Sequence, residues 1–557
     1  MASIIEKTAE GTIYKSPRTL TVPGVDLLTL LFESEQCYSP DDKILHADAD
    51  NPSNCLTKGQ VCLQSKRLAM LLRDQYGVGA QGPSRDVVFN ISGGHFMLPL
   101  IFYATLAAEG IFSSTSPSAT PEELAYQLKE TTPKIIICNE ESKANAVAAA
   151  KLVGFPPHNI LSYEGEKHIE LCEAVSGVRI PRSNQELDWR RITDARELAD
   201  SVVCLLFSSG TTGLPKAMKL SHRNLVAESS LVLEPIKEYN AKFRAPDYKY
   251  ISIAHLPANH IAGVMGYLVN ATYMRGVVYW MKKFDFVKFC EYSKKYGMTT
   301  GFTVPPIFLL ITKAPNVTDQ FDEWADAIAG AAPMGEELQV AVGKKLGKGT
   351  TRLRQTWGLS ETTGSITVVP LETELWMPGT VGTLVANHSA RIIDDDGRDV
   401  EPGQEGEILV RGPVVINGYW KNPKADAEAF KNGWFYTGDI GVFRNGWLYI
   451  ELIKYKGTQV APAELEALLL SHPKIHDVAV IGVEGDGTEL PRAYVVADPK
   501  QVSEQEIKSF VAKQVAPYKQ LRGGVIYIPA IPKSPSGKIL RKELRELAKK
   551  EARTSKL

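Results

Sequence analysis

The chain has 557 residues and a formal net charge of −1 at pH 7, because 63 lysines and arginines nearly balance 64 aspartates and glutamates. This balance argues against the strongly basic surface with which proteins bind nucleic acids or anionic membranes. Apolar residues make up 44% of the sequence, which provides a large buried core and excludes an intrinsically disordered chain. The length leaves room for about two to four compact units.

The seven cysteines all lie between Cys37 and Cys290, and no two have the CxxC spacing of a zinc or redox site. We interpret them as reduced thiols in a reducing compartment. The N-terminus lacks the apolar core of a secretory signal. The most apolar stretch, residues 97–108, is too short to span a bilayer and contains Pro99, so it predicts a buried helix and no membrane span.

Strand-like and helix-like segments alternate up to about residue 380, which predicts a layered α/β architecture. The helix predicted over residues 121–128 has Thr120 as its N-cap and Pro121 in its first turn. The predicted strands are nearly continuous apolar runs, so we expect sheets covered on both faces. They lie at residues 86–91, 134–138, 202–207 and 277–280.

From residue 381 to residue 449 the chain is rich in turn residues between short alternating strands, which predicts a small β-barrel or meander. After Glu451 a helix at 462–469 precedes strands at 477–482 and 492–496. We therefore predict two domains. Residues 1–450 form a large N-terminal domain of layered α/β sheets plus a small β-barrel, and residues 451–557 form a smaller, mobile α+β C-terminal domain.

The predicted strand at 202–207 runs directly into a loop of hydroxyls and glycines that ends in a lysine. The loop consists of Ser208, Ser209, Gly210, Thr211, Thr212, Gly213, Leu214, Pro215 and Lys216. Glycines let backbone N–H groups turn toward an anion, hydroxyls donate to phosphate oxygens, and lysine adds positive charge. The loop lacks the Walker pattern GxxxxGK[ST]. By composition alone, a flexible surface loop would be the better explanation, because such loops are common.

The order of residues in this loop resembles the signature loop of the adenylate-forming superfamily. That superfamily includes acyl-CoA synthetases, 4-coumarate ligases, firefly luciferase and the adenylation domains of peptide synthetases. The segment SHRNL at residues 221–225 follows at the family's usual place. Because further motifs follow in the family's order, the chain is identified as a member of its AMP-binding, acyl-CoA synthetase and 4-coumarate–CoA ligase-like branch.

Three segments resemble the family's nucleotide site: GAAPMG at 330–335, QTWGLSETT at 355–363 and YTGD at 436–439. The resemblance assigns contacts with ATP or AMP to Gly330, Ala331, Ala332, Thr356, Trp357, Gly358, Ser360 and Asp439. It implies that Trp357 stacks on adenine where the family usually has tyrosine, and that Asp439 accepts hydrogen bonds from the ribose. Ser360 would reach the α-phosphate or the substrate carboxylate, and Glu361 would hold Mg²⁺.

Residues 256–263, LPANHIAG, resemble the family's LPxxHIxG segment. The resemblance implies that His260 stands between the ATP and acyl pockets, and that Gly263, Tyr267 and Leu359 contact the acid. Without the resemblance, an isolated histidine in an apolar segment is more simply interpreted as a hydrogen-bonded core residue.

Two segments near the C-terminus complete the resemblance. Residues 454–466, KYKGTQVAPAELE, resemble the 4-coumarate ligase branch, which implies that Lys454 and Gln459 contact the adenylate and that Lys456 and Gly457 lie beside the CoA arm. Residues 532–541, PKSPSGKILR, match the C-terminal signature, whose catalytic lysine corresponds to Lys538.

One departure from the family pattern lies between the two predicted domains. The family has a segment reading roughly VDRxK before the ELIKYKG run, but here Ile450 is followed directly by Glu451. The absent segment would have carried the ribose arginine and the hinge residue. Three explanations remain open: a mispredicted splice product, an impaired or inactive paralogue, or a shortened hinge that works with Arg444 or another group as substitute.

The resemblance implies an ATP-dependent carboxylic acid:CoA ligase that forms an acyl-adenylate and then a thioester, using ATP, Mg²⁺ and CoA. The alternatives are an adenylating enzyme that passes acyl-AMP to a carrier protein, a luciferase-like oxidase and a non-catalytic nucleotide- or acyl-binding paralogue. No carrier domain follows Leu557, which favours free CoA. The 4-coumarate-like motifs favour an aryl or arylpropenoic acid, whereas a peroxisomal enzyme would equally suit a fatty acid.

The chain ends in Ser555, Lys556 and Leu557, a tripeptide that the peroxisomal import receptor reads at a free C-terminus. A solvated tail that matches by chance is the simpler alternative. We predict a peroxisomal location, and otherwise a cytoplasmic one.

Overall fold

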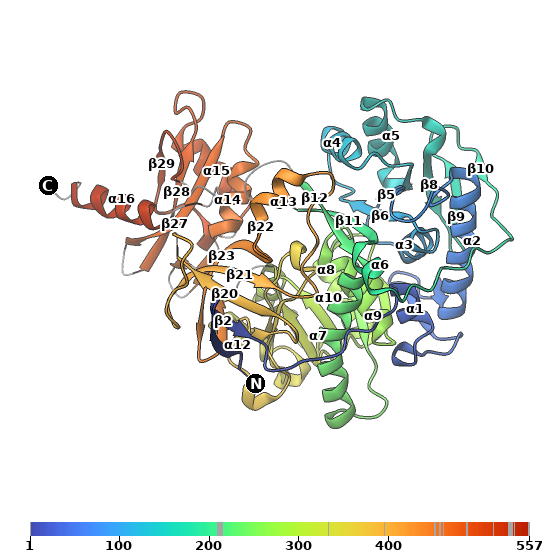
Figure 1. Ribbon diagram of the computed structural model, residues 1–557, viewed down its shortest axis with the longest axis horizontal. Helices are drawn as coiled ribbons and strands as arrows, with labels where there is room; N and C mark the ends of the chain where they lie inside the picture. Colours follow the sequence, from blue (N-terminus) through green and yellow to red (C-terminus); the bar gives the residue numbers. More distant parts are fainter. Residues whose placement is uncertain are drawn as a thin grey trace.

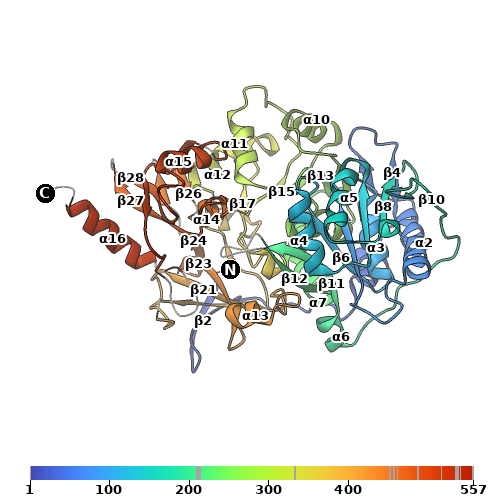
Figure 2. The same cartoon turned by 90° about the horizontal axis from the view of Figure 1, so that it is seen from above.

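The computed structural model describes residues 2–208, 215–331, 334–394, 396–450, 453–455, 458–460, 462–485, 488–515, 517–532, 539 and 541–554. A large N-terminal part carries a smaller C-terminal lobe at one end (Figure 1). Seen from above, this lobe lies at the opposite end of the molecule from α2 (Lys58–Tyr76) and β10 (Arg179–Ile180) (Figure 2).

The largest sheet has eight strands in the order β10-β9-β8-β7-β5-β6-β11-β12. Its strands besides β10 are β5 (Val87–Ile91), β6 (Ile111–Thr115), β7 (Ile135–Asn139), β8 (Ile160–Glu164), β9 (Glu170–Glu173), β11 (Val202–Ser208) and β12 (Lys216–Ser221). The pairs β5–β6, β5–β7, β7–β8 and β6–β11 are parallel, whereas both edges of the sheet are antiparallel. All five residues of β5, β6 and β7 are buried, as continuous apolar runs predict for a sheet covered on both faces.

Two smaller sheets extend the N-terminal part. One has the order β13-β14-β3-β4, built from β3 (Ile44–Asp48), β4 (Cys55–Thr57), β13 (Ile251–Ala254) and β14 (Val277–Trp280). The other is parallel throughout and contains β15 (Thr300–Thr303), β16 (Asp326–Ala329) and β17 (Arg354–Gln355). The short pair β18 (Thr367–Val368) and β19 (Thr383–Leu384) follows them in the chain.

Helices connect these strands, and two of them confirm predictions made from the sequence. Helix α3 (Leu98–Ala107) is buried along its whole length, as the apolar stretch 97–108 predicted. Helix α4 (Pro121–Thr131) begins with a capping box in which Thr120 and Glu123 satisfy each other's backbone N–H groups. The other helices of the N-terminal part are α1 (Leu27–Phe32), α5 (Lys143–Leu152), α6 (Ala195–Asp200), α7 (His222–Phe243), α8 (Ile261–Gly263), α9 (Ala271–Tyr273), α10 (Phe286–Tyr296), α11 (Pro305–Lys313), α12 (Glu336–Gly343) and α13 (Pro423–Ala429).

Short 3-10 and π-helical segments interrupt the loops. They are η1 (Glu35–Cys37), η2 (Glu140–Ser142), η3 (Pro157–Asn159), the π-helical η4 (Val264–Asn270), η5 (Gly347–Gly349), η6 (Ser360–Thr362), η7 (Thr373–Leu375) and, in the C-terminal lobe, η8 (Pro517–Lys519). Among the residues that the structure describes, no helix combines the length and apolar character needed to cross a bilayer.

The turn-rich region after residue 381 forms a seven-stranded antiparallel sheet, but the sequence did not predict all of its strands. It contains β1 (Ile4–Thr8), β2 (Gly11–Lys15), β20 (Ser389–Ile393), β21 (Gly406–Arg411), β22 (Phe430–Lys431), β23 (Trp434–Arg444) and β24 (Trp447–Ile450). The N-terminal hairpin joins through Tyr14, which pairs with Ala390 and stacks on Phe443 with 4.1 Å between ring centroids. A local periodicity cannot indicate this pairing between distant segments.

The C-terminal lobe has its own buried core. It contains β25 (Ile453–Tyr455), β26 (Thr458–Val460), α14 (Pro462–Leu470), β27 (Asp477–Gly485), β28 (Thr488–Val496), α15 (Glu504–Ala512), β29 (Val525–Tyr527) and α16 (Arg541–Thr554). Helix α14 and strands β27 and β28 match the predicted helix and strands. Leu465, Val480 and Val495 lie at the centre of this core, apart from the core of the N-terminal part.

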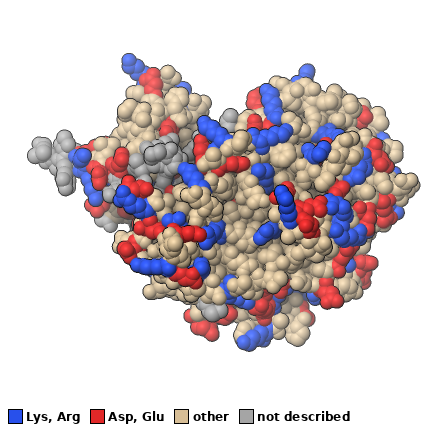
Figure 3. Space-filling view, viewed as in Figure 1, with Lys and Arg blue, Asp and Glu red and all other residues tan. Residues whose placement is uncertain are grey.

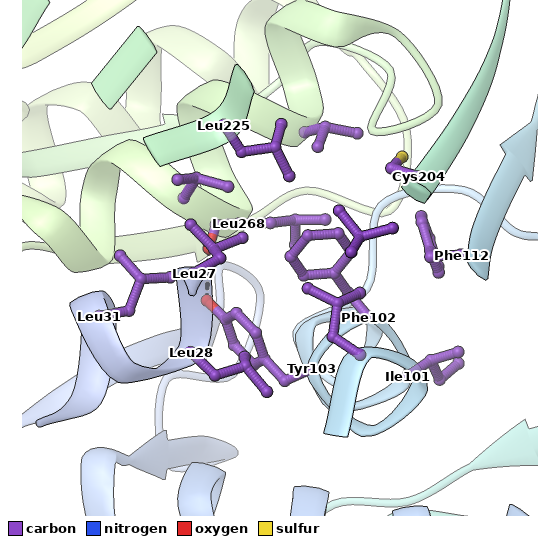
Figure 4. Packing of buried hydrophobic residues seen from close by; sticks show 14 of the residues in the cluster. Leu27, Leu28, Leu31, Ile101, Phe102, Tyr103, Phe112, Cys204, Leu225 and Leu268 are labelled. Carbon is purple, nitrogen blue, oxygen red and sulfur yellow. Dashed lines mark hydrogen bonds between the residues drawn. The ribbon is translucent and has the colours of Figure 1, made fainter. Parts of the chain in front are cut away.

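The main core lies where α1, α3, α7 and η4 meet beside the eight-stranded sheet. Leu27, Phe102, Leu225 and Leu268 point toward one another from these four elements (Figure 4). Tyr103 lies at the same place, and its hydroxyl donates a hydrogen bond to the carbonyl of Leu268. This core fixes η4 and α7, which carry residues next to the candidate site.

Truncation within this core should cost much more than truncation at the surface. Leu100→Ala removes a fully buried side chain of α3, so we expect a loss of about 2–5 kcal/mol in the free energy of unfolding. Leu152→Ala, at a leucine that is 56% exposed, should change it by less than about 0.5 kcal/mol. Urea unfolding followed by circular dichroism measures both, and equal losses would contradict the assigned core.

Candidate active site

The hydroxyl- and glycine-rich loop connects the last two strands of the large sheet. Ser208 ends β11 and is the register partner of Lys216, which begins β12, so the loop joins the two strands of a hairpin. The Tyr126 hydroxyl on α4 donates to the carbonyl of Pro215 at 3.1 Å and holds the loop's C-terminal end. The predicted strand at 202–207 is confirmed and extends to Ser208, whereas residues 209–214 of the loop lie outside the described residues.

A lysine, a tyrosine and a buried glutamate gather where this hairpin closes. The Lys216 ammonium lies 5.4 Å from the centroid of the Tyr419 ring. The Tyr419 hydroxyl donates to the carboxylate of Glu361 at 3.1 Å. Glu361 is 9% exposed, and burial raises its pKa while the Tyr419 hydrogen bond and the charge of Lys216 oppose that rise. The arrangement places one carboxylate beside one fixed positive charge at the end of the loop.

This site fits a magnesium ion of the kind that phosphate substrates bring. Within the described ranges, no group of three or more histidine, cysteine, aspartate or glutamate side chains could hold a metal by itself. Mg²⁺ is commonly bound through one or two carboxylates, with waters and substrate phosphates as its remaining ligands. Glu361 supplies one such carboxylate.

Trp357 and Asp439, assigned by resemblance to adenine and ribose, meet directly. The Trp357 indole N–H donates to the Asp439 carboxylate at 2.8 Å. Trp357 is only 8% exposed, and its backbone N–H donates to the Thr367 hydroxyl at 3.0 Å. The indole therefore has one edge fixed by a carboxylate, and one oxygen of Asp439 already accepts a hydrogen bond.

Asp439 also faces the C-terminal lobe. Burial raises its pKa, and the hydrogen bond from Trp357 and the positive charge of Arg541 oppose that rise. Arg541, at the start of α16, pairs with both carboxylate oxygens of the buried Glu466 at 2.7 and 2.6 Å. A guanidinium of the C-terminal lobe thus acts electrostatically on the carboxylate assigned to the ribose.

The turn assigned to adenine has a strained backbone. Gly330 is buried and its N–H donates to the Thr303 carbonyl at 3.3 Å, whereas Ala331 is exposed with a φ of +66°, which non-glycine residues rarely adopt. The Gln355 side chain holds the backbone of Met334 in this turn. Its oxygen accepts a hydrogen bond from the Met334 N–H at 2.9 Å, and its amide nitrogen donates one to the Met334 carbonyl at 3.0 Å.

The loop that begins directly after β17, at Thr356, is closely packed. The Thr356 hydroxyl donates to the carbonyl of Thr367 at 2.7 Å and so fixes the residue before Trp357. Gly358 has no room for a side chain, since a Cβ there would lie 1.7 Å from the carbonyl oxygen of Gly364. Leu359 and Ser360 are half-buried, and Ser360 opens η6 directly before Glu361.

The segment assigned to the acid contains two histidines with different surroundings. His260 is exposed and stands directly before α8, whose last residue is the buried Gly263. His255 is the buried core histidine, because it hydrogen-bonds the Ile253 carbonyl and the Thr303 hydroxyl, both at 2.8 Å, and burial lowers its pKa to about 4. His260 is less enclosed than His255, although its partial removal from water still lowers its pKa.

Tyr267 is deeply buried, and its hydroxyl oxygen accepts hydrogen bonds from the backbone N–H groups of His255 and Leu256 at 3.3 and 3.1 Å. Its hydroxyl fixes the preceding segment.

Several predicted site residues lie outside the described residues: Ser209, Gly210, Thr211, Thr212, Gly213, Ala332, Lys456, Gly457, Lys538 and the terminal tripeptide 555–557. The backbone of Ser208, Lys454 and Gln459 is described in β11, β25 and β26, and Lys454 pairs with Gln459.

The connection between the two lobes is short. Strand β24 ends at Ile450 and β25 begins at Ile453, so only residues 451 and 452 separate the seven-stranded sheet from the first strand of the C-terminal lobe. The departure found in the sequence lies at this junction.

The sequence analysis named neither Tyr419, which belongs to the site, nor Glu228, which is buried beside the loop that carries Glu361. Tyr419 follows a turn and touches both Glu361 and Lys216 only through the fold. Glu228 lies on α7 with its side chain next to Ser365. A charged residue in the apolar face of a helix was the one available signal for Glu228.

The fold and these contacts define a two-lobed α/β protein with a nucleotide-type site, and comparison with known proteins agrees. The model of the AMP-binding enzyme family matches residues 34–420, and that of the AMP-binding enzyme C-terminal domain matches residues 464–538. A protein of Emericella nidulans named as an acyl-coenzyme A synthetase is 43% identical over 553 residues, covering 97% of this chain and 99% of its own length.

4-Coumarate:CoA ligase 1 of Petunia hybrida is 38% identical over 506 residues and covers 88% of each chain. The structure of ATP-bound MatB from Rhodopseudomonas palustris superposes on this one with a TM-score of 0.66 and covers 94% of this chain and 98% of that one. Its sequence is 24% identical, so the likeness shows a shared fold. This chain belongs to the AMP-binding enzyme family.

The hydrogen bond between Trp357 and Asp439 predicts a measurable effect on nucleotide affinity. Trp357→Phe keeps an aromatic ring but removes the donor, so we expect AMP to bind about tenfold more weakly. Trp376→Phe is the matched control, because its indole N–H donates to the Leu353 carbonyl at 2.8 Å, away from Asp439. Isothermal titration with AMP measures both variants, and equal affinities would contradict the assigned role.

Proposed function

We propose that this protein activates a carboxylic acid with ATP and transfers the acyl group to CoA. Membership in the AMP-binding enzyme family makes the chain an AMP-forming acid–thiol ligase. The observation that carries the proposal is the convergence of two pairs, Lys216 with Glu361 at the loop and Trp357 with Asp439 beside it. Burial is the main reason that the pKa of Glu361 is raised, and the charge of Asp439 adds to it, which supports the view that the two pairs act on one substrate.

The reaction has two steps whose atoms balance. A carboxylate oxygen of the acid attacks the α-phosphorus of ATP, and the bond to pyrophosphate breaks with its electron pair. The thiol of CoA then gives its proton to water, its sulfur attacks the carbonyl carbon of the acyl-adenylate, and the bond from that carbon to the phosphate oxygen breaks so that AMP leaves with the electron pair. All reacting groups are anionic, so the protein contributes positioning and positive charge.

In this proposal the loop from Ser208 to Lys216 holds the phosphates and Lys538 stabilises the charge that develops at the α-phosphate. Glu361 would hold Mg²⁺, which would neutralise charge on the outgoing pyrophosphate. Asp439, oriented by Trp357, accepts from the ribose hydroxyls. Lys454 and Gln459 contact the adenylate, and Lys456 with Gly457 lies beside the CoA arm.

The acid would lie against His260, Gly263, the ring of Tyr267 and Leu359. An aryl, arylpropenoic or fatty acid fits the proposal, and the likeness to the Petunia 4-coumarate:CoA ligase supports the aryl classes. We further propose that the terminal Ser555-Lys556-Leu557 directs the protein to peroxisomes through their import receptor.

We propose a domain boundary between residues 450 and 451, with the second domain carrying Lys538. Each side has its own buried core, which supports the division. The alternatives are transfer of the acyl group to a carrier protein and a paralogue that binds nucleotide without catalysis. Pyrophosphate exchange that depends on an acid separates a ligase from a binder, and CoA consumption separates the two acceptors.

Replacement of the proposed catalytic lysine tests the first step. In Lys538→Ala we expect acid-dependent ATP–pyrophosphate exchange to fall by about 10²–10³-fold, because the developing charge loses its stabilising ammonium. Lys549→Ala, at an exposed lysine on α16, is the matched control and should keep the wild-type rate. Undiminished exchange in Lys538→Ala would remove the proposed role of this residue.

The short connection predicts a weak second step. Insertion of Val-Asp-Arg-Xaa-Lys between Ile450 and Glu451 should raise thioester formation from preformed acyl-adenylate about tenfold or more, because rotation of the C-terminal lobe becomes easier. An inserted Gly-Ser-Gly-Ser-Gly segment of the same length separates the effect of length from that of the arginine. Unchanged rates in both insertions would show that the short connection does not restrict the reaction.

A further inference from the structure

A polar cavity lies between the two lobes, and none of the steps above uses it. Its volume is about 190 Å³, which leaves room for several water molecules. Among the described residues that line it, only Glu405, in the loop before β21, belongs to the N-terminal part. The charged lining residues of the C-terminal lobe are Arg541, Arg545 and Glu489. A carboxylate of one lobe and two guanidinium groups of the other therefore face the same cavity.

Both arginines lie at the start of α16, which is the end of this helix nearest to the N-terminal part. Figures 1 and 2 show that α16 runs from there away from the body of the molecule to the C-terminus. Arg541 and Arg545 are four residues apart, so they lie on the same face of the helix. Side chains of both signs are interspersed where the C-terminal lobe meets the N-terminal part (Figure 3). The two arginines are therefore placed to interact with an acidic residue of the N-terminal part.

Helix α16 is packed onto its own lobe along its length. Leu544 and Ala548 are buried in a cluster with residues of β27 and β28. The Arg492 guanidinium donates to the Glu551 carboxylate at 3.1 Å and so holds the last turns of the helix to β28. An attraction that acts on the two arginines is therefore transmitted to the whole C-terminal lobe.

The lobe orientation in this structure suits the first step of the proposed reaction. Burial raises the pKa of Asp439, the carboxylate assigned to the ribose, and the charge of Arg541 opposes that rise, so the start of α16 lies close to the nucleotide site. Lys538 precedes Arg541 by three residues, which limits the distance between their Cα atoms to about 11 Å. An orientation that keeps Arg541 close to Asp439 therefore keeps the proposed catalytic lysine near the site.

We propose that Glu405 is a positioning residue that attracts Arg541 and Arg545 across the cavity and stabilises the lobe orientation in which the acid is adenylated. The inference rests on the proposed function and adds to it a residue that acts through the C-terminal lobe. Arg444 lies 3.8 Å from Glu405, but both side chains are more than half exposed, and exposed pairs of this kind contribute little. Charges that face a partly enclosed cavity are screened less by water than charges at the open surface.

The acidic residues of the C-terminal lobe cannot take the place of Glu405. Glu466 pairs with Arg541 at 2.6 Å, and Glu489 lines the cavity, but both belong to the lobe and turn with it. They neutralise part of the charge of the arginines without linking the lobe to the N-terminal part. We therefore expect Glu405 to have a moderate effect that is confined to the orientation of the lobe.

The test separates the two steps of the reaction. Glu405→Gln removes the charge and keeps the size, so we expect acid-dependent ATP–pyrophosphate exchange to fall about two- to fivefold. Thioester formation from preformed acyl-adenylate should keep the wild-type rate or exceed it, because the second step follows rotation of the lobe. Glu405→Arg should lower exchange about tenfold, because it places like charges across the cavity. Addition of Arg545→Glu to that variant reverses both charges and should restore most of the exchange.

Glu401→Gln is the matched control, because it neutralises an exposed glutamate of the same loop that does not line the cavity. It should keep the wild-type rates of both steps, and thermal unfolding of each variant shows whether it is folded. An equal loss of both steps in Glu405→Gln, or a charge reversal that Arg545→Glu does not rescue, overturns the inference and leaves the proposed function standing. A wild-type protein that shows no acid-dependent exchange with any acid overturns the proposed function and the inference with it.

Discussion

The hydrogen bond from the Trp357 indole to the Asp439 carboxylate is the contact on which the nucleotide site depends. It joins two segments 82 residues apart, one in the loop after β17 and the other in β23. Asp439 is held in a buried environment that favours its neutral form, and the indole donor and Arg541 oppose this effect. An ionised carboxylate accepts hydrogen bonds on both oxygens, so the indole donor and Arg541 favour the form of Asp439 that accepts most of them.

The same balance between burial and local charge recurs at Glu361. Its carboxylate is removed from water, which favours protonation, but Tyr419 and Lys216 act against this on one side of the residue. The negative charge of Asp439 adds to the effect of burial and further favours the protonated form of Glu361.

The sequence predicted the elements of this fold better than their long-range pairing. Helix α4 with its Thr120 cap, the buried α3 and strand β14 follow from local patterns and lie where they were predicted. The N-terminal hairpin pairs with β20 across more than 370 residues, and no periodicity within either segment indicates that contact. The motif order placed Trp357 and Asp439 in one site, but their direct hydrogen bond and the contribution of Tyr419 follow from geometry alone.

The junction at residues 451 and 452 raises a different physical question. Strand β24 is hydrogen-bonded to β23, and β25 is hydrogen-bonded to β26, so both sides of the junction are held by ladders. A rotation of one lobe against the other must be absorbed by the few backbone dihedral angles between them. Arg541 already lies close enough to Asp439 to affect its ionisation, and any such rotation would change that interaction. Glu466, which pairs with Arg541, acts on Asp439 with the opposite sign, so the ionisation of Asp439 depends on how both charges of the C-terminal lobe are oriented toward it.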